Sequence, residues 1–438
     1  MAGEKSVAFV AEQQIPPSPP PVRTGGALGW ARDNLFSGVF NSVATLLSLA
    51  FVAYILAMVV PWLFIDSVWN ASSLQGCREV DDGACLAVIN ERFLQFVFGF
   101  YPEELRWRPI LAFVLLFVAI WPALFSSAPR KLLIFSALYP LLAYWLIWGG
   151  SLWGPVGAVV GIAIGWACIR FLPPLLARGR LDEGLAFLAA VGAGILGAAL
   201  WWLFCVIAFE EALSTVLAIS LEPVESARLG GFLLSTIIGV SGIAGSLPIG
   251  IVLALGRQSN LILIKGVCVG FIEFIRGVPL ITLLFVAWLL LSYFLPPGTE
   301  FDLILRVVIM VTAFASAYMA EVIRGGLAGL PRGQYEAADS LGLDYWKSMR
   351  LIVLPQALKI SIPGIVNTFI GLFKDTTLVI IIGLLDPVGL LQPIRADQNW
   401  NGIVWELYGF IALFFFIFCF AMSRYSMYLE RNLDVGHR

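Results

Sequence analysis

The stretch Gln334–Gln356, QYEAADSLGLDYWKSMRLIVLPQ, is polar, although the sequence on both sides of it is apolar. Its first part, as far as Leu341, contains good helix formers. Gly342 can adopt the left-handed conformation that ends a helix, and Asp344 can cap the next one. Pro355 is expected to stop that second helix. The stretch therefore predicts a bent pair of short helices that protrudes from a bilayer and fits a groove on a partner.

The composition of the whole chain indicates a membrane protein. Of its 438 residues, 60% are hydrophobic and 13% are charged, whereas soluble domains are about half apolar and a quarter charged. The net charge of −2 and the absence of a basic run argue against a nucleic-acid partner. Residues 1–37 contain the proline-rich IPPSPPPVRTGG and are expected to form a disordered tail rather than a signal peptide.

Long apolar segments recur along the chain, and about 20 residues suffice to cross roughly 30 Å of hydrocarbon. The sequence therefore predicts an all-α polytopic membrane protein with about ten transmembrane helices. The predicted spans are 38–64, 109–126, 132–149, 153–173, 186–209, 230–255, 262–295 (long and broken), 303–323, 357–385 and 404–423.

Basic residues after every second span predict the orientation. They are Arg130, Lys131, Arg178, Arg180, Arg257, Lys265, Arg324, Arg332, Lys347, Arg350, Arg424 and Arg431. By the positive-inside rule these residues and both termini lie in the cytoplasm. The opposite loop at 65–108 contains four arginines, but it is too long for its charges to set the topology.

The chain changes character near residue 220. Residues 38–220 are expected to form an accessory bundle of about five spans with a periplasmic loop at 65–108, and they carry almost no charge inside the spans. Residues 221–438 form a core in which Gly and Pro interrupt the helices, with a polar loop at 324–355. We expect the accessory bundle to be peripheral, outside any transport path.

The polar loop matches a known signature. Glu336-Ala337-Ala338, then Gly342, then Ile352, Leu354 and Pro355 resemble the EAA motif (EAA, three residues, G, nine residues, I-x-L-P) of type I ABC importer permeases. The resemblance implies that this loop docks into an ATPase subunit. The implied coupling residues are Tyr335, Glu336, Ala337, Ala338, Leu341 and Gly342.

Other stretches extend the resemblance. GFIEFIRGVPLITLLF at 270–285 and the segments at 318–342 and 354–379 are similar to polar amino-acid permeases. The extra N-terminal spans resemble the long-chain branch of the general L-amino-acid importer. The resemblance implies a permease subunit of an ATP-driven L-amino-acid importer in the bacterial inner membrane. Its implied partners are two copies of an ABC ATPase, a second related permease and a periplasmic amino-acid-binding protein.

The chain offers little for catalysis of its own. It has no GxxxxGK[ST] phosphate loop, and its one histidine is His437, so HExxH zinc sites and histidine-based triads are excluded. We therefore expect no enzyme activity, no metal and no cofactor in this chain. ATP and Mg would bind to the partner ATPase.

Ionisable residues at membrane depth are costly and are therefore candidates for function. Glu273 and Arg276 lie three residues apart and are expected to neutralise each other, and the following Gly277 and Pro279 should break that helix. Glu321 and Arg324 form a second pair with the same spacing at the root of the polar loop. We predict structural or gating roles for these six residues.

A further polar group lies inside the span at 357–385. It comprises Asn367, Lys374, Asp375, Thr376 and Thr377. A zwitterionic amino acid needs a cation, an anion and neutral hydrogen-bonding groups, so this group is a candidate substrate path. The alternative is a salt bridge that only holds the packing of the span.

Cys77 and Cys85 lie in the polar loop CREVDDGAC. In an oxidising periplasm they are expected to form a disulfide, and otherwise they are two free thiols.

Two other classes of function stay open. An ion-coupled secondary amino-acid transporter would show an inverted repeat with paired broken helices, and only one break is clear here. A membrane-embedded enzyme or an assembly scaffold is the third alternative. An accompanying ATPase and binding protein would distinguish the importer from both.

Overall fold

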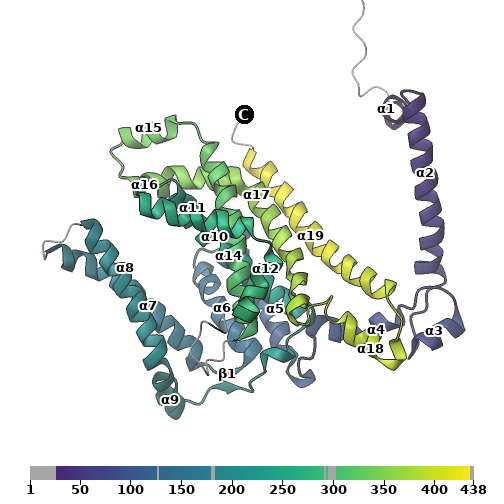
Figure 1. The fold of residues 1–438 in the computed structure, drawn as a ribbon, viewed down its shortest axis with the longest axis horizontal. Helices are drawn as coiled ribbons and strands as arrows, with labels where there is room; N and C mark the ends of the chain where they lie inside the picture. Colours follow the sequence, from purple (N-terminus) through teal and green to yellow (C-terminus); the bar gives the residue numbers. More distant parts are fainter. Residues whose placement is uncertain (1–25, 126–127, 179–182, 291–292, 294–301, 435–438) are drawn as a thin grey trace, which may run out of the picture. The chain divides into compact units, whose positions relative to one another are not determined.

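A computed structural model describes residues 26–125, 128–178, 183–290, 293 and 302–434, and Figure 1 shows the helices in chain order. The chain divides into two compact units. The first contains residues 1–70 and 75–86, and the second contains residues 71–74 and 87–438. Of the residues that the sequence singles out, Arg180 and His437 lie outside the described part of the chain.

The first unit begins with two helices, α1 (Gly26–Leu35) and α2 (Val39–Val60), and α2 continues as a π-helix over Pro61–Ile65. Helix α1 corrects the expectation that the whole of 1–37 is a disordered tail. Helix α2 has no buried residue although it is strongly apolar, as expected for a helix that faces lipid.

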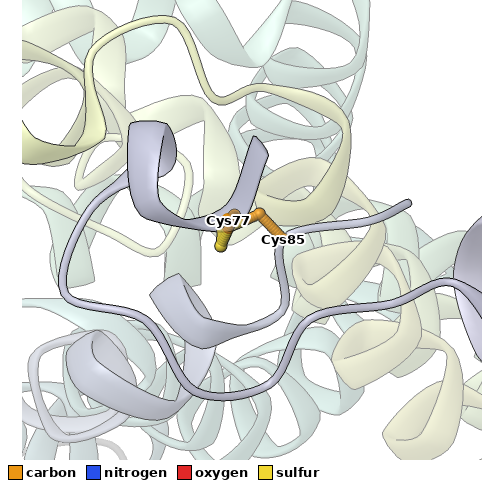
Figure 2. The surroundings of a disulfide bond; sticks show 2 residues. All are labelled: Cys77 and Cys85. Carbon is orange, nitrogen blue, oxygen red and sulfur yellow. A yellow bond between two sulfur atoms is a disulfide. The ribbon is translucent and has the colours of Figure 1, made fainter. Parts of the chain in front are cut away.

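The segment after α2 folds back on itself. Val68 forms an isolated bridge with Cys85, and the Ala84 N–H donates to the Trp62 carbonyl at 2.8 Å. Helix α3 (Leu74–Val80) carries Cys77, and Figure 2 shows its disulfide with Cys85. The disulfide that the sequence led us to expect therefore closes this short loop.

The second unit is almost entirely helical. Its elements before the predicted boundary near residue 220 are α4 (Ala87–Phe98), α5 (Trp107–Leu124), α6 (Leu132–Trp148), β1 (Gly150–Ser151), α7 (Trp153–Arg178), α8 (Glu183–Leu200), a π-helix (Trp201–Cys205), α9 (Val206–Val216) and β2 (Ser220–Leu221). Strands β1 and β2 pair antiparallel, with Gly150 opposite Leu221.

The remaining elements form the region that the sequence assigns to the core. They are α10 (Gly231–Arg257), α11 (Ile262–Gly277), α12 (Leu280–Phe285), a π-helix (Val286–Leu290), α14 (Leu303–Ala328), α15 (Gly333–Ser340), α16 (Tyr345–Ser348), a π-helix (Met349–Val353), α17 (Leu354–Asp375), a 3-10 helix (Thr376–Ile382), α18 (Leu391–Ala396) and α19 (Trp405–Asp434).

The all-α multi-pass architecture is confirmed. Among the described residues, eight helical segments are long and apolar enough to cross a membrane. The bent pair formed by α11 and the helix from Leu280 to Leu290 makes a ninth, with 104° between its two parts. The remaining predicted span corresponds to α6, which is apolar but only 17 residues long.

Glycines allow two helices to approach α14 closely. A Cβ atom on Gly250 of α10 would lie 2.7 Å from Met319 of α14. A Cβ atom on Gly326 of α14 would lie 2.5 Å from the carbonyl oxygen of Ala357 in α17. Small residues are how membrane helices gain packing energy, because lipid offers no hydrophobic driving force between them. Helix α14 is therefore the packing centre of the core region.

Helices α5 and α6 belong to the same hydrophobic core as α10 and α14. Ala112 and Ile147 are buried in one cluster with Ile238 and Val307. The expectation of a peripheral bundle therefore does not describe these two helices. The charge-poor sequence that suggested a peripheral position reflects burial against the core as much as exposure to lipid.

Helices α7, α8 and α9 pack mainly on one another. A Cβ atom on Gly194 of α8 would lie 2.9 Å from the carbonyl oxygen of Gly165 in α7, and the indole N–H of Trp201 donates to the carbonyl of Gly157 at 2.9 Å. Within the second unit, these three helices are therefore a part of the predicted accessory bundle that is packed mainly on itself.

Candidate functional site

Helices α15 and α16 form the bent pair that the sequence predicts. Gly342 lies between them with a φ of +67°, and a Cβ atom there would have no atom within 4 Å. Asp344 caps α16, because its carboxylate accepts a hydrogen bond from the Lys347 backbone N–H at 2.8 Å. The Lys347 ammonium also lies 2.8 Å from this carboxylate, and these contacts lower the pKa of Asp344.

The predicted coupling residues point in two directions. Glu336, Ala337, Leu341 and Gly342 are exposed, and Leu341 has 72% of its surface accessible. Ala338 is fully buried. Tyr335 is half-buried and packs against a cluster that includes Met349, Val353 and Ala357. Tyr335 and Ala338 therefore hold the loop in place, and the other four are available to a partner.

Pro355 does not end the second helix, contrary to the sequence prediction. Helix α16 runs through the π-helix Met349–Val353 into α17, which continues to Asp375. The N–H of Leu354 donates to the carbonyl of Met349, five residues earlier. This wide turn comes directly before the proline, which occupies the first turn of α17, so the missing N–H of Pro355 does not interrupt the helix.

A mainly apolar hollow of about 460 Å³ lies beside α16. It is lined by Leu255, Trp346, Met349, Arg350, Leu354, Pro355 and Leu358. Trp346 is 69% exposed, so its indole forms part of an open apolar surface on an otherwise polar loop.

A cluster of ion pairs lies at the root of the loop and is centred on Glu321 of α14. The Glu321 carboxylate accepts hydrogen bonds from Arg257 of α10 at 2.7 Å and from Arg324 of α14 at 3.0 Å. Arg276 of α11 lies 3.6 Å from the same carboxylate. The predicted Glu321–Arg324 pair is therefore present, within a larger cluster that ties three helices together.

The predicted Glu273–Arg276 pair is not found. Glu273 instead accepts a hydrogen bond from Arg257 at 2.9 Å. Arg276 faces Glu321, and its guanidinium also lies over the ring of Tyr318 at 5.6 Å. The spacing along α11 allowed a local pair, but the ends of α10 and α14 offer each side chain a closer partner. Sequence reasoning treated Arg257 only as a topology signal and missed its place in the cluster.

The predicted helix break follows directly after Arg276. Helix α11 ends at Gly277, and α12 begins at Leu280, after Pro279. The Pro279 carbonyl accepts hydrogen bonds from the N–H groups of Thr282 at 3.0 Å and Leu283 at 3.3 Å. The backbone at the break is therefore partly satisfied from within, as a bend at membrane depth requires.

The five residues of the predicted substrate path do not form one cluster. Asn367 and Lys374 are exposed and lie seven residues apart, hence on one face of α17. Thr376 is buried and donates to the Phe373 carbonyl at 2.7 Å, and Thr377 donates to the Lys374 carbonyl at 2.9 Å. In the described part of the chain, no carboxylate lies within ion-pair distance of Lys374. An amide and an ammonium on an uncovered face are unsuited to lipid contact.

Possible metal ligands were compared across the described residues. Within the described ranges, no group of three His, Cys, Asp or Glu side chains is arranged to hold a metal ion.

Removing the central charge of the cluster should cost more than removing a peripheral one. Glu321→Gln leaves Arg257, Arg276 and Arg324 close together around a neutral group. The Glu321 side chain is only 15% exposed, so solvent screens these charges poorly. We therefore expect the substitution to lower the free energy of unfolding by about 3 kcal/mol. The control Glu273→Gln removes a carboxylate that is 55% exposed and should cost at most about 1 kcal/mol. Thermal unfolding of the purified protein in detergent measures both, and equal shifts would show that Glu321 is not the centre.

Comparison with known proteins places this geometry in a family. Residues 246–435 match the family described as "Binding-protein-dependent transport system inner membrane component". The chain is 54% identical to the "Glutamate/glutamine/aspartate/asparagine transport system permease protein BztC" of Rhodobacter capsulatus, over 98% of this chain and 99% of that one. It is 39% identical to the "Inner membrane amino-acid ABC transporter permease protein YhdY" of Escherichia coli, over 96% and 97%.

Among solved structures, similarity extends to "Crystal structure of an amino acid ABC transporter with histidines", at 30% identity and a TM-score of 0.41. The match covers 46% of this chain and 91% of that one. Full-length similarity to two permeases fixes the family. The chain belongs to the amino-acid ABC transporter permeases, multi-pass subunits of the bacterial inner membrane that are not themselves enzymes and that work with an ATPase and a substrate-binding protein.

Proposed function

We propose that this chain is one of two different permease subunits in an importer of L-amino acids, and that its α15–α16 loop docks into the ATPase. The proposal is supported mainly by the loop itself. It is an exposed pair of helices, α15 and α16, held in shape by the buried Ala338 and by the Asp344 cap. Glu336, Ala337, Leu341 and Gly342 form the outward surface. ATP with Mg binds on the partner.

The loop has the properties of a docking element. Leu341 and Trp346 are large apolar side chains that are 72% and 69% exposed on a polar segment. Exposed apolar groups rimmed by polar ones mark interaction sites. The buried Ala338 fixes α15 from below, so the outward surface is pre-formed, which reduces the entropy lost when a partner binds.

The orientation follows from the same loop. Arg332, Lys347 and Arg350 lie in it, and Arg257 and Arg324 lie at its root. By the positive-inside rule we propose that this end of the second unit lies in the cytoplasm. The proposal that both termini are cytoplasmic rests on the basic residues after every second span of the sequence. The opposite end, with α4 and α18, faces the periplasm and the amino-acid-binding protein.

The uncovered face of α17 supports a second permease. Asn367 and Lys374 are exposed on a helix long enough to span the membrane. We place the second permease against this face and the substrate path along it, with Asp375 and Thr377 at its periplasmic end. The buried Thr376 holds the backbone there through its hydrogen bond to the Phe373 carbonyl. Polar groups that line a protein cavity avoid the cost of contact with lipid.

Gly342 provides the first test. A β-branched side chain is strained at a φ of +67°, by about 1–2 kcal/mol. Gly342→Val should therefore bend the loop away from its docked form and weaken coupling about tenfold, since 1.4 kcal/mol is a factor of ten. Amino-acid uptake and receptor-stimulated ATPase activity of the assembled complex measure the loss.

Gly333 is the matched control. It is also exposed, with no atom within 4 Å of a Cβ, but it lies in α15 and has no positive φ. Gly333→Val should keep uptake within about twofold of the wild type, because valine is no less favourable than glycine in a helix. Normal uptake and stimulation in Gly342→Val would contradict the docking role.

Subunit composition provides the second test. We expect native mass measurement of the purified complex to give one copy of this chain, one copy of a different permease and two copies of the ATPase. The uncovered polar face of α17 is covered equally well by a different permease or by a second copy of this chain, so the composition must be measured. A complex with two copies of this chain and no other permease would refute the proposed pairing.

A further inference from the structure

Helix α4 lies in the predicted periplasmic loop, outside the core region, yet it packs on two core helices. Phe96 of α4 is fully buried, with its ring 5.3 Å from that of Phe410 in α19. Phe232 of α10 lies 6.3 Å from the same ring. These aromatic contacts place α4 against the periplasmic ends of α10 and α19.

The backbone after α4 touches the start of α10. Gly99 forms an isolated bridge with Leu229, and a Cβ atom on Gly99 would lie 2.5 Å from the Cα atom of Gly230. A Cβ atom on Gly231 would lie 2.1 Å from the carbonyl oxygen of Phe96. Both Gly99 and Gly231 have positive φ values, +66° and +61°. This approach is therefore possible only with glycine, and the segment after α4 is fixed to the core.

The same junction holds the core loop between the 3-10 helix and α19, residues 383–404, which carries α18. The Gly231 N–H donates to the Leu385 carbonyl at 2.7 Å. Asp386 is fully buried and accepts hydrogen bonds from the N–H groups of Gly389 at 2.9 Å and Val388 at 3.2 Å. Burial raises the pKa of Asp386 to about 6. The first part of the loop is thus an ordered turn anchored beside α4.

The second part of the loop is held by an ion pair. Arg92 of α4 donates through Nη2 to Oδ2 of Asp397, which directly follows α18. The other carboxylate oxygen of Asp397 accepts from the Asn399 N–H at 2.9 Å. The side chains of Arg92 and Asp397 are 27% and 28% exposed, so solvent screens the pair only in part. Glu91 and Gln95 approach Arg92 less closely, each at 3.5 Å.

We propose that α4 acts as a clamp on the periplasmic loop 383–404, and that Arg92 is the positioning residue that sets this loop for docking of the binding protein. The inference rests on the proposed orientation. The accessory segment is then part of the receptor-facing surface of the permease. It holds the loop directly at Asp397 through Arg92. It also packs on Gly230 and Gly231 of the core, and the Gly231 N–H donates to the Leu385 carbonyl of the loop.

A charge-swap series tests the clamp in the assembled transporter. The readout is the concentration of binding protein that gives half-maximal ATPase stimulation, alongside the activity without binding protein and the amount of subunit. Arg92→Glu and Asp397→Arg should each raise that concentration roughly tenfold, because each puts like charges in contact. The double variant should return it to within about twofold of the wild type.

Glu104→Arg is the matched control, since it makes the same charge change as Asp397→Arg at an exposed site in the same accessory segment. It should leave the half-maximal concentration unchanged. If Arg92→Glu fails to assemble, Arg92→Gln removes the pair without repulsion and should shift the concentration in the same direction, by a smaller factor.

Two results would overturn the clamp: single variants that match the wild type, or a double variant that is no better than the single ones. Failure of the proposed function would look different. In that case the wild-type complex itself would show no stimulation by the binding protein.

Discussion

The close approach of α10 and α17 to α14 is the constraint on which the core depends. Gly250 and Gly326 leave no room for a side chain at the two crossings. In a bilayer this packing substitutes for the hydrophobic effect that holds soluble helices together. It also brings Arg257 to the carboxylate of Glu321, so the ion cluster is a consequence of how the helices pack.

The cluster links two features that are far apart in the sequence. Arg276 precedes the bend between α11 and α12, and Arg324 is the first residue of the polar loop at 324–355. Both contact Glu321. One carboxylate therefore joins the residue before the bend to the root of the polar loop. Two discrete arrangements of this cluster would be needed for gating.

Local features were predictable from sequence, and long-range partners were not. The left-handed Gly342 and the Asp344 cap depend on a few neighbouring residues, and the structure confirms both. The partner of Glu273 depends on where α10 ends, and the spacing along α11 does not contain that information. Pro355 was misread because the π-turn before it changes the hydrogen-bond register.

In residues 38–220, too, the sequence did not predict contacts between distant parts of the chain. Its lack of charge suggested a peripheral bundle, but α5 and α6 share the core of α10 and α14, and α4 fixes a core loop. The Arg92–Asp397 pair joins residues 305 positions apart. Apolar sequence indicates burial in lipid or in protein without distinguishing the two, so the position of these helices required the structure.

Site-specific cross-linking in membranes tests the central claim, that the α15–α16 loop contacts the ATPase. The four free cysteines of the described chain, Cys168, Cys205, Cys268 and Cys419, are first replaced by serine. Leu341→Cys then places a thiol on the outward face of the loop, and Trp405→Cys places one at an exposed site at the start of α19. If the loop docks there, Leu341→Cys gives a covalent adduct with the ATPase and Trp405→Cys gives none. An adduct only from Trp405→Cys would contradict it.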